Sequence, residues 1–142
     1  LWSAIYIDPL SVQAFNALGI VYLVRGELSP AISIHSWAAL LKPDNEIAYY
    51  NLSLAYHRQK LYAMAIANGK RAASLEPDNP HPLVAIAIAH WDNGERAAAI
   101  KTYRDAIGVD GRYKEVNFLN YLKEAGFSTD QIETSKQVLA AS

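Results

Sequence analysis

The stretch Phe15–Asn45, FNALGIVYLVRGELSPAISIHSWAALLKPDN, sets the pattern for most of the chain. It contains an apolar helical pattern, a turn at Gly26, a second apolar helical pattern and a stop at Pro43. Much of the same pattern returns twice further along the chain. We therefore treat the sequence as an internal repeat, because a fixed period predicts the architecture better than any single segment does.

Equal spacing of several residue types defines the repeat. Pro9, Pro43 and Pro77 are separated by steps of 34 residues, and Gly111 occupies the next place. Small residues keep the same step in three further series, which are Ala4, Ala38, Ala72 and Ala106, then Ala31, Ala65 and Ala99, and then Gly19, Ser53 and Ala87. Small residues at fixed positions let two antiparallel helices approach closely, so the repeat predicts stacked helix pairs.

Glycines and prolines predict where the helices end. Gly26 and Gly94 stand at the turn within a pair, where glycine readily takes the left-handed conformation. Lys60 holds this place in the middle copy, so we expect backbone strain there. The prolines end the second helix of each pair, because the residue before a proline avoids the helical region. We predict helices over about 12–25, 28–41, 46–59, 62–75, 80–93 and 96–108.

The pattern fades after the third copy. Residues 114–125, KEVNFLNYLKEA, are predicted to form one helix that ends at Gly126. Ser128 and Gln131 have the spacing of a capping box and predict the start of a last helix. We expect this final pair to act as a cap, because a stack of repeats must shield its last apolar face.

These residues resemble the tetratricopeptide repeat. The pattern of that family has an aromatic residue, Leu-Gly and Tyr in the first helix, then Ala and Phe in the second, then Pro. His35 takes the place of the phenylalanine in the first copy, Gly69 departs from it in the second, and the third copy is looser. The matching residues in the first two copies are Phe15, Leu18, Gly19, Tyr22, Ala31 and Pro43, and Tyr49, Leu52, Tyr56, Ala65 and Pro77.

The resemblance implies an all-α fold and a single domain over residues 1–142. This fold is a right-handed α-solenoid of antiparallel helix pairs, with about three tetratricopeptide units plus flanking helices. The implied divisions are 1–9 as the tail of a preceding repeat helix, 12–45, 46–79 and 80–113 as repeats 1 to 3, and 114–142 as a degenerate repeat with C-terminal capping helices.

Composition and charge exclude several classes of function. The 142 residues are 51% hydrophobic and 19% charged, with a formal net charge of −1, so no global field attracts nucleic acid or an anionic membrane. The chain has no cysteine, which excludes disulfides, thiolate metal sites and a cysteine nucleophile. It also lacks the run of about 18 apolar residues that a membrane-spanning helix needs. We favour a cytoplasmic location, although this composition also suits the periplasm.

The N-terminal part of the chain leaves one question open. The chain starts at Leu1 with no basic-then-apolar signal, and we expect it to be part of a longer protein. Few charges occur before the second repeat. Either upstream repeats normally cover this surface, or the first repeat is simply well packed. The charged residues within the first 45 positions are Asp8, Arg25, Glu27, Lys42 and Asp44.

The sequence contains no recognisable catalytic motif. Its histidines, His35, His57, His81 and His90, form no HExxH motif and no pair at helical i, i+4 spacing. We expect His35 and His90 to be packing substitutes, because they fall where the family packs aromatic residues. No GxSxG, Walker loop or GxGxxG occurs. We therefore expect no enzyme activity, no metal and no cofactor.

The resemblance implies a binding surface instead. In this family the first helix of each pair lines the concave face of the superhelix, and that face binds peptides. Helical spacing supports this choice, since the chosen positions of each helix lie on one face. The predicted partner-binding groove consists of Gln13, Asn16, Ile20, Ile47, Tyr50, Asn51, Leu54, His57, Arg58, His81, Val84, Ile88, Trp91 and Asp92, with Leu23 and Val24 beside them.

Two known specificities of the family do not fit these residues. Chaperone-tail-binding repeats hold a terminal carboxylate with lysines, asparagines and an arginine, and only Asn51 agrees with that clamp. Sugar-transferase repeats carry an asparagine ladder, which this chain lacks. In this chain, the positions equivalent to the carboxylate clamp of the chaperone-tail-binding repeats are occupied by Asn16, Ile20, Asn51, His81 and Ala85.

We predict a non-catalytic protein–protein interaction scaffold. It would bind a partner peptide or an amphipathic helix with apolar anchors in the concave groove, and not an acidic tail or nucleic acid. The chain's own C-terminal helix or a neighbouring subunit is the alternative occupant of the groove. Two other functions stay open, which are a self-assembly module that forms homo-oligomers through exposed repeat ends, and a substrate-recruiting arm of an enzyme elsewhere in the parent chain.

Overall fold

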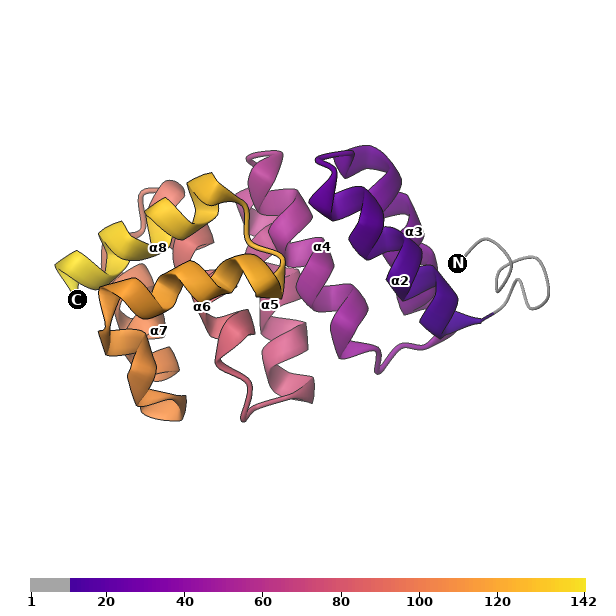
Figure 1. Cartoon of the computed structure of the whole chain (residues 1–142). Helices are drawn as coiled ribbons and strands as arrows, with labels where there is room; N and C mark the ends of the chain where they lie inside the picture. Colours follow the sequence, from indigo (N-terminus) through magenta and orange to yellow (C-terminus); the bar gives the residue numbers. More distant parts are fainter. Residues whose placement is uncertain (1–10) are drawn as a thin grey trace.

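Helices make up the regular secondary structure of the described residues, 11–142, in the computed structural model (Figure 1). None of them combines the length and the apolar character needed to cross a bilayer. The predicted tail of a preceding repeat helix, 1–9, lies outside the described residues. The elements are α2 (Val12–Val24), α3 (Leu28–Leu41), α4 (Glu46–Arg58), α5 (Tyr62–Leu75), α6 (Pro80–Asp92), α7 (Arg96–Val109), the 3₁₀ helices η1 (Gly111–Lys114) and η2 (Val116–Ala125), and α8 (Thr129–Ala141).

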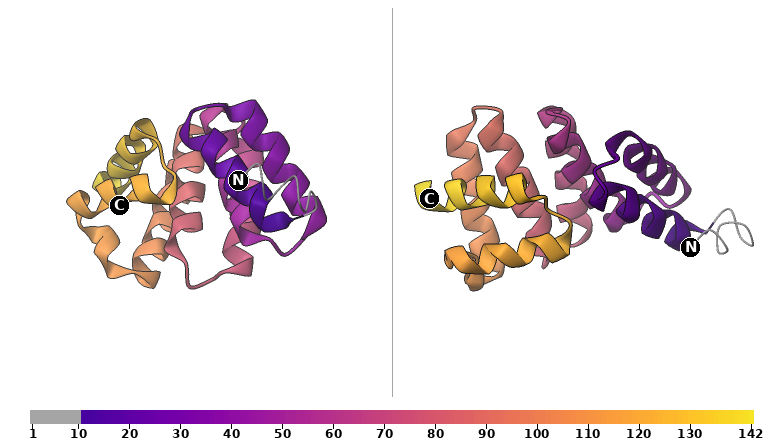
Figure 2. Two further views of the ribbon diagram at one scale, coloured as in Figure 1. Left: turned by 45° about the vertical axis from the view of Figure 1, so that its right-hand side comes forward. Right: turned by 45° about the horizontal axis from the view of Figure 1, so that its top comes forward.

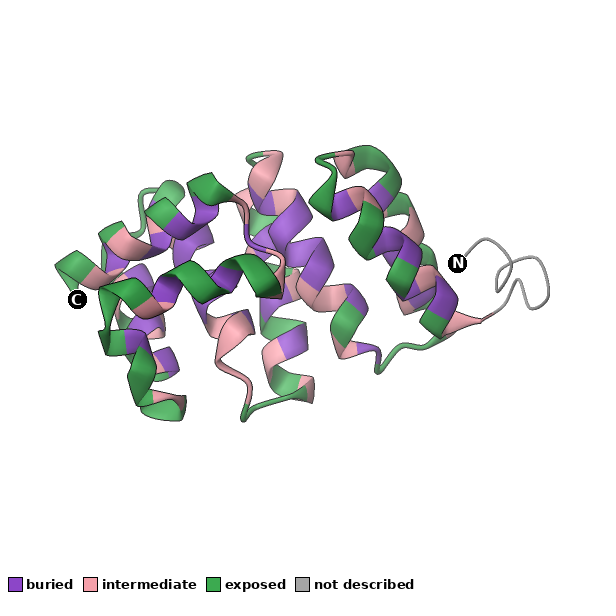
Figure 3. Ribbon diagram, in the orientation of Figure 1, coloured by how far each residue is buried: buried purple, intermediate pink, exposed green. Residues whose placement is uncertain are grey.

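The helices form antiparallel pairs that stack side by side. Helix α2 packs on α3, α4 on α5 and α6 on α7, and each pair also contacts the next (Figures 1 and 2). Buried residues concentrate on α4 and α6, the helices in the middle of the stack (Figure 3). This confirms the predicted all-α solenoid, and the bounds of the paired helices differ from the predicted ones by at most one residue.

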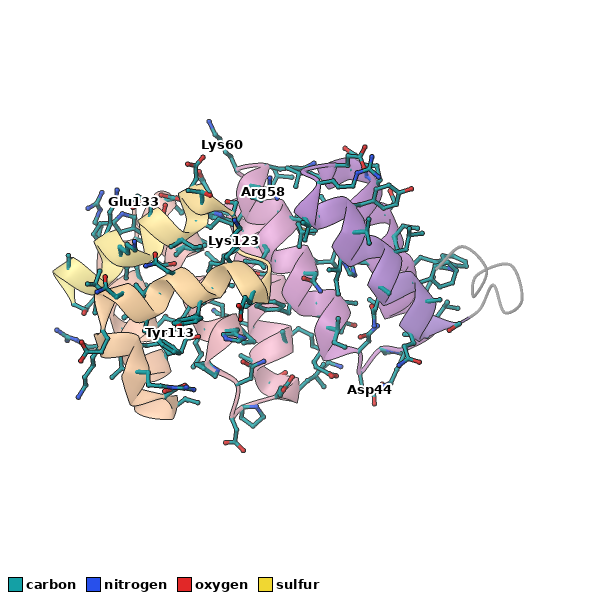
Figure 4. The ribbon with its side chains drawn as sticks, viewed as in Figure 1. Asp44, Arg58, Lys60, Tyr113, Lys123 and Glu133 are labelled. Carbon is teal, nitrogen blue, oxygen red and sulfur yellow. The ribbon has the colours of Figure 1, made fainter. Side chains whose placement is uncertain are left out.

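The turns within the pairs all use the left-handed backbone conformation. Gly26 has a φ of 77° and Gly94 a φ of 80°, as expected for glycine at these places. Lys60 takes the same conformation in the middle pair, with a φ of 63°. Its side chain is exposed and points away from the stack (Figure 4). The left-handed conformation costs a residue with a Cβ atom roughly 1 kcal/mol, which confirms the expected strain.

Close packing within and between the pairs depends on glycines opposite large side chains. A Cβ atom on Gly19 of α2 would lie only 2.5 Å from Nε2 of His35 on α3. A Cβ atom on Gly69 of α5 would lie 2.6 Å from Cγ1 of Ile86 on α6. Gly69, where the sequence departs from the family pattern, thus makes room for a large residue of the following pair.

His35 is a fully buried packing residue, as its position predicts. Its two ring nitrogens have no hydrogen-bond partner among the described residues. Burial therefore lowers the pKa of His35 from 6.5 to about 4. His90 differs, because it is only partly buried and its Nδ1 lies 3.0 Å from the Glu95 carboxylate. The packing interpretation therefore applies fully to His35 alone.

The C-terminal part departs from the single regular helix predicted over residues 114–125. It forms η1 and η2, which are separated by an extended residue, Glu115. Leu119, Leu122 and Ala125 recur every three residues, and a 3₁₀ helix, with three residues per turn, keeps all of them on one side. The predicted boundary holds, since η2 ends at a left-handed Gly126. The predicted capping box at the start of α8 is also present.

We expect the substitution Lys60→Gly to stabilise the protein. Glycine carries no Cβ penalty at a φ of 63°, so the free energy of unfolding should rise by about 1 kcal/mol in urea denaturation. Lys60→Ala is the matched control, because alanine removes the same charged side chain but retains the Cβ atom. An equal gain in the alanine variant would show that the strain explanation is wrong.

We expect His35 to make the protein less stable as the pH falls. The pKa of folded His35 lies below its unfolded value of 6.5, so its contribution is fully present above pH 6.5 and is lost as the pH falls towards 4. At pH 5 the free energy of unfolding should be about 2 kcal/mol lower than at pH 7 because of His35, and the substitution His35→Phe should abolish this contribution. Urea denaturation of the wild type and of His35→Phe at pH 7 and pH 5 measures this contribution. His90→Gln is the control, and it should retain the loss of stability at pH 5. The same loss in His35→Phe would contradict this account.

Candidate partner-binding groove

The first helices of the three pairs, α2, α4 and α6, form the predicted groove, and part of it is filled by the chain itself. Helices η2 and α8, which we call the C-terminal pair, lie alongside each other and cross the stack in front of α6 (Figures 1 and 2). Helix α8 contacts both α6 and α7. The C-terminal pair therefore closes the end of the groove that is far from α2.

The C-terminal pair and the groove share one apolar core. Leu54 of α4 and Val84 and Ile88 of α6 are fully buried. The prediction that they line an open groove does not hold for these three residues, because the amphipathic C-terminal pair removes them from solvent. For this part of the groove the chain's own C-terminal segment is the occupant. Its residues in the same core are Leu119, Leu122, Phe127, Ile132 and Val138.

Gln131 fixes the C-terminal pair to α4 by hydrogen bonds. Its Nε2 donates to the backbone oxygen of Leu54 at 3.1 Å and lies 2.9 Å from Nδ1 of His57. Its Oε1 accepts from the backbone N–H of Ser128 at 2.9 Å. A backbone carbonyl only accepts and a backbone N–H only donates, so the orientation of this amide is determined. Nδ1 of His57 must then be an acceptor and carry no proton.

The same network defines the state of His57. With Nδ1 as acceptor, the proton lies on Nε2, which donates to Oδ2 of Asp92 at 2.7 Å. Burial lowers the pKa of His57 more than the Asp92 carboxylate raises it. The His57 imidazole is therefore neutral and donates to the Asp92 carboxylate, and the hydrogen bond between these two predicted groove residues joins α4 to α6. No cluster of three or more metal-ligating side chains occurs within residues 11–142.

Other predicted anchors are also occupied within the molecule. The hydroxyl of Tyr50 donates to the backbone oxygen of Ala125 at 2.5 Å, and burial raises the pKa of this tyrosine. Arg58 donates from Nη1 to the backbone oxygen of Leu23 at 2.9 Å. Trp91 is almost completely buried. Tyr50 thus connects α4 to the C-terminal pair, and Arg58 connects α4 to the first repeat, so the Tyr50 hydroxyl and Nη1 of Arg58 already have partners within the molecule.

The two predicted asparagines have structural roles as well. Asn16 and Asn45 exchange a pair of side-chain hydrogen bonds of 3.0 and 3.1 Å, which join α2 to the turn before α4. Asn51 donates from Nδ2 to the backbone oxygen of Ile47 at 2.9 Å. All three side chains are largely buried, and Asn51 also lines the cavity between α2, α4 and the end of η2.

The part of the groove nearest α2 is open. A cavity of about 320 Å³ lies between α2, α4 and the end of η2. Its most exposed apolar walls are Ile20, Val24 and Ile47, with exposed fractions of 39%, 71% and 43%. Tyr50 also lines it. We call this cavity the open groove. Of the remaining predicted residues, Gln13 is exposed on α2, and His81 lines a second hollow near η2.

Charged residues that the sequence did not single out border the open groove. Glu46 opens α4, Glu76 follows α5, and Lys123 and Glu124 lie near the end of η2. Lys123 is at the side of the C-terminal pair that faces α4 (Figure 4). The 34-residue period could not reveal this grouping, because η2 falls outside the period and folds back across the stack.

Comparison with known sequences identifies the repeat. The family model of the tetratricopeptide repeat matches residues 47–79 and 81–113. Serine/threonine-protein phosphatase 5 from Homo sapiens and from Rattus norvegicus is 30% identical over 94 residues, which are 66% of this chain and 19% of the phosphatase. The chain thus spans about a fifth of the length of these curated relatives.

Comparison with solved structures supports the same fold. The crystal structure of MamA has a TM-score of 0.74 at 20% identity, covering 98% of this chain and 82% of that one. The first TPR of Spaghetti (RPAP3), bound to the HSP90 peptide SRMEEVD, has a TM-score of 0.72 at 16% identity, with 94% of each chain covered. The TPR2B domain of yeast Sti1, in a pHsp70 complex, has a TM-score of 0.71 at 19% identity, covering 92% and 96%.

Three findings agree with one another. They are the 34-residue spacing of prolines and small residues, the stacked helix pairs, and the family match to two complete repeats. The chain therefore contains two tetratricopeptide repeats, at residues 47–79 and 81–113, and shares the fold of solved tetratricopeptide-repeat domains.

Proposed function

We propose that this protein is a non-catalytic interaction scaffold that binds a segment of a partner protein in the open groove. The observation that carries the proposal is the exposure of Ile20, Val24 and Ile47 on one concave surface. Apolar side chains gathered in a hollow are typical of binding sites. Two solved relatives with this fold were determined with a chaperone peptide or protein, which supports the class of function.

The size of the open groove favours a short contact. A cavity of about 320 Å³ is at the lower end of the range for ligand pockets, so it accommodates a few side chains. The C-terminal pair prevents a partner from extending over Leu54, Val84 and Ile88. The partner therefore contacts mainly α2 and α4, and its affinity comes chiefly from burying aliphatic anchors.

An acidic terminal tail does not suit this groove. Ile20 and Ala85 stand at two of the places where the chaperone-tail clamp needs a cationic or amide side chain. Ile20 forms part of the apolar wall, and Ala85 is buried. Without a basic group at either place, a terminal carboxylate has no charge-assisted hydrogen bond there. We infer that the specificity differs from that of the peptide-bound relatives.

A second candidate function is self-association through the first repeat. Val21 on α2 has an exposed fraction of 42%, whereas Ala55 and Ala89, one and two repeats later, are fully buried. The stacking face of the first repeat is thus available for another helix pair. A second copy of the chain, joined at this face, would form an oligomer.

We expect peptides selected against this protein from a displayed random library to depend on the open groove. Val24→Ser should weaken the binding of a selected peptide about tenfold, because it removes an apolar contact without disturbing the core. Leu40→Ser is the matched control, since Leu40 is 69% exposed on α3, away from the groove. Fluorescence anisotropy gives the dissociation constants. Equal effects of both substitutions, or none, would contradict the proposed site.

Light scattering over a range of concentrations tests self-association. If copies join through the first repeat, the average mass rises with concentration, and Val21→Asp restores the monomer mass because it places a charge on the stacking face. A strict monomer at high concentration would eliminate this second candidate and leave the groove proposal intact.

A further inference from the structure

We propose that the open groove selects a basic amphipathic helix, with aliphatic anchors on one face and lysine or arginine beside them. This inference rests on the proposed function and adds the chemical class of the partner. It starts from the charges around the groove, which the composition of the chain as a whole does not reveal.

Three carboxylates and one ammonium group border the open groove. Glu46, Glu76 and Glu124 line the same cavity as Ile47, together with Lys123, so the border carries two more negative than positive charges. Within residues 11–142 none of the three glutamates lies in a salt bridge. A hollow that has apolar walls and charge of one sign concentrates the electric field and attracts groups of opposite sign.

The acidic border is a local feature. The net charge of the whole chain is only −1. Helix α2, which supplies Ile20 and Val24, contains no charged residue. The glutamates come from the other sides of the cavity, Glu46 from α4, Glu76 from the end of α5 and Glu124 from η2. The open groove therefore has a neutral apolar wall opposite an acidic border.

This division matches an amphipathic helix better than an extended peptide. Ile20 and Val24 are spaced i, i+4 on α2 and form a continuous apolar strip. A partner helix can place its apolar face on this strip, while basic side chains from the edges of that face reach the glutamates. The adjoining part of the same groove already packs against helices, those of the C-terminal pair. The partner would thus continue an existing mode of packing.

The probes are two fluorescein-labelled helical peptides of equal length, one of leucine, alanine and lysine and the other of leucine, alanine and glutamate. Binding to the full chain is measured by fluorescence anisotropy at low and at high salt. We expect the lysine peptide to bind at least about tenfold more tightly, and added salt to reduce this preference because it screens the charges.

Substitution of the glutamates tests the origin of the preference. The triple variant Glu46→Gln, Glu76→Gln and Glu124→Gln should bind the two peptides with nearly equal affinity. Glu133→Gln is the matched control on the exposed side of α8 and should retain the preference. Circular dichroism shows whether each variant is folded. The single variants provide the same comparison if the triple variant does not fold.

The outcomes separate this inference from the proposed function. A lysine preference that the triple variant loses supports the inference. Equal binding of both peptides, abolished by Ile47→Ser, overturns the charge selection but leaves the groove as the binding site. Tighter binding of the glutamate peptide, or no binding of either peptide, overturns the inference. In that case the displayed-peptide experiment still decides whether the groove binds partners at all.

Discussion

The hydrogen bonds of Gln131 determine how much of the groove a partner can reach. This one amide joins the start of α8 to the backbone of Leu54 and to His57, while its oxygen caps its own helix. A buried amide with all these partners is costly to displace, because each group left unpaired loses about 1–3 kcal/mol. The bonds therefore place Phe127 and Ile132 over the far part of the groove and divide it into a filled part and an open part.

Most of the fold could be predicted from the sequence, because each repeat shows the same signals for where its helices end and where they pack closely. Prolines and small residues in phase predicted the bounds of the helix pairs, and the left-handed backbone at Lys60 followed from the glycines at the equivalent turns. The 3₁₀ form of η2 was missed. Its apolar residues Leu119 and Leu122 fit both an α-helix and a 3₁₀ helix, and only packing against the stack distinguishes the two.

The candidate site was less predictable, for a physical reason. Helical spacing indicates which residues share a face, but not what covers that face. Tyr50 and Arg58 were identified on the correct helix, yet both donate hydrogen bonds to backbone oxygens within the molecule. Conversely, Glu46 and Glu124 are far apart in the sequence and line the same cavity only because η2 folds back across the stack. The capping box predicted that α8 exists, but it contained no information on where α8 packs.

The low charge of the first repeat can now be interpreted. A well-packed repeat would bury its apolar residues, but Val24 is 71% exposed on α2 and Leu40 is 69% exposed on α3. These exposed side chains favour the other explanation, and they support our proposal that this apolar surface is covered when the protein associates with a partner. The groove side of that surface lies opposite glutamates on α4, α5 and η2. A neutral helix beside an acidic border lets apolar burial provide affinity while charge provides selectivity, because charges at the rim of a contact affect specificity more than binding strength.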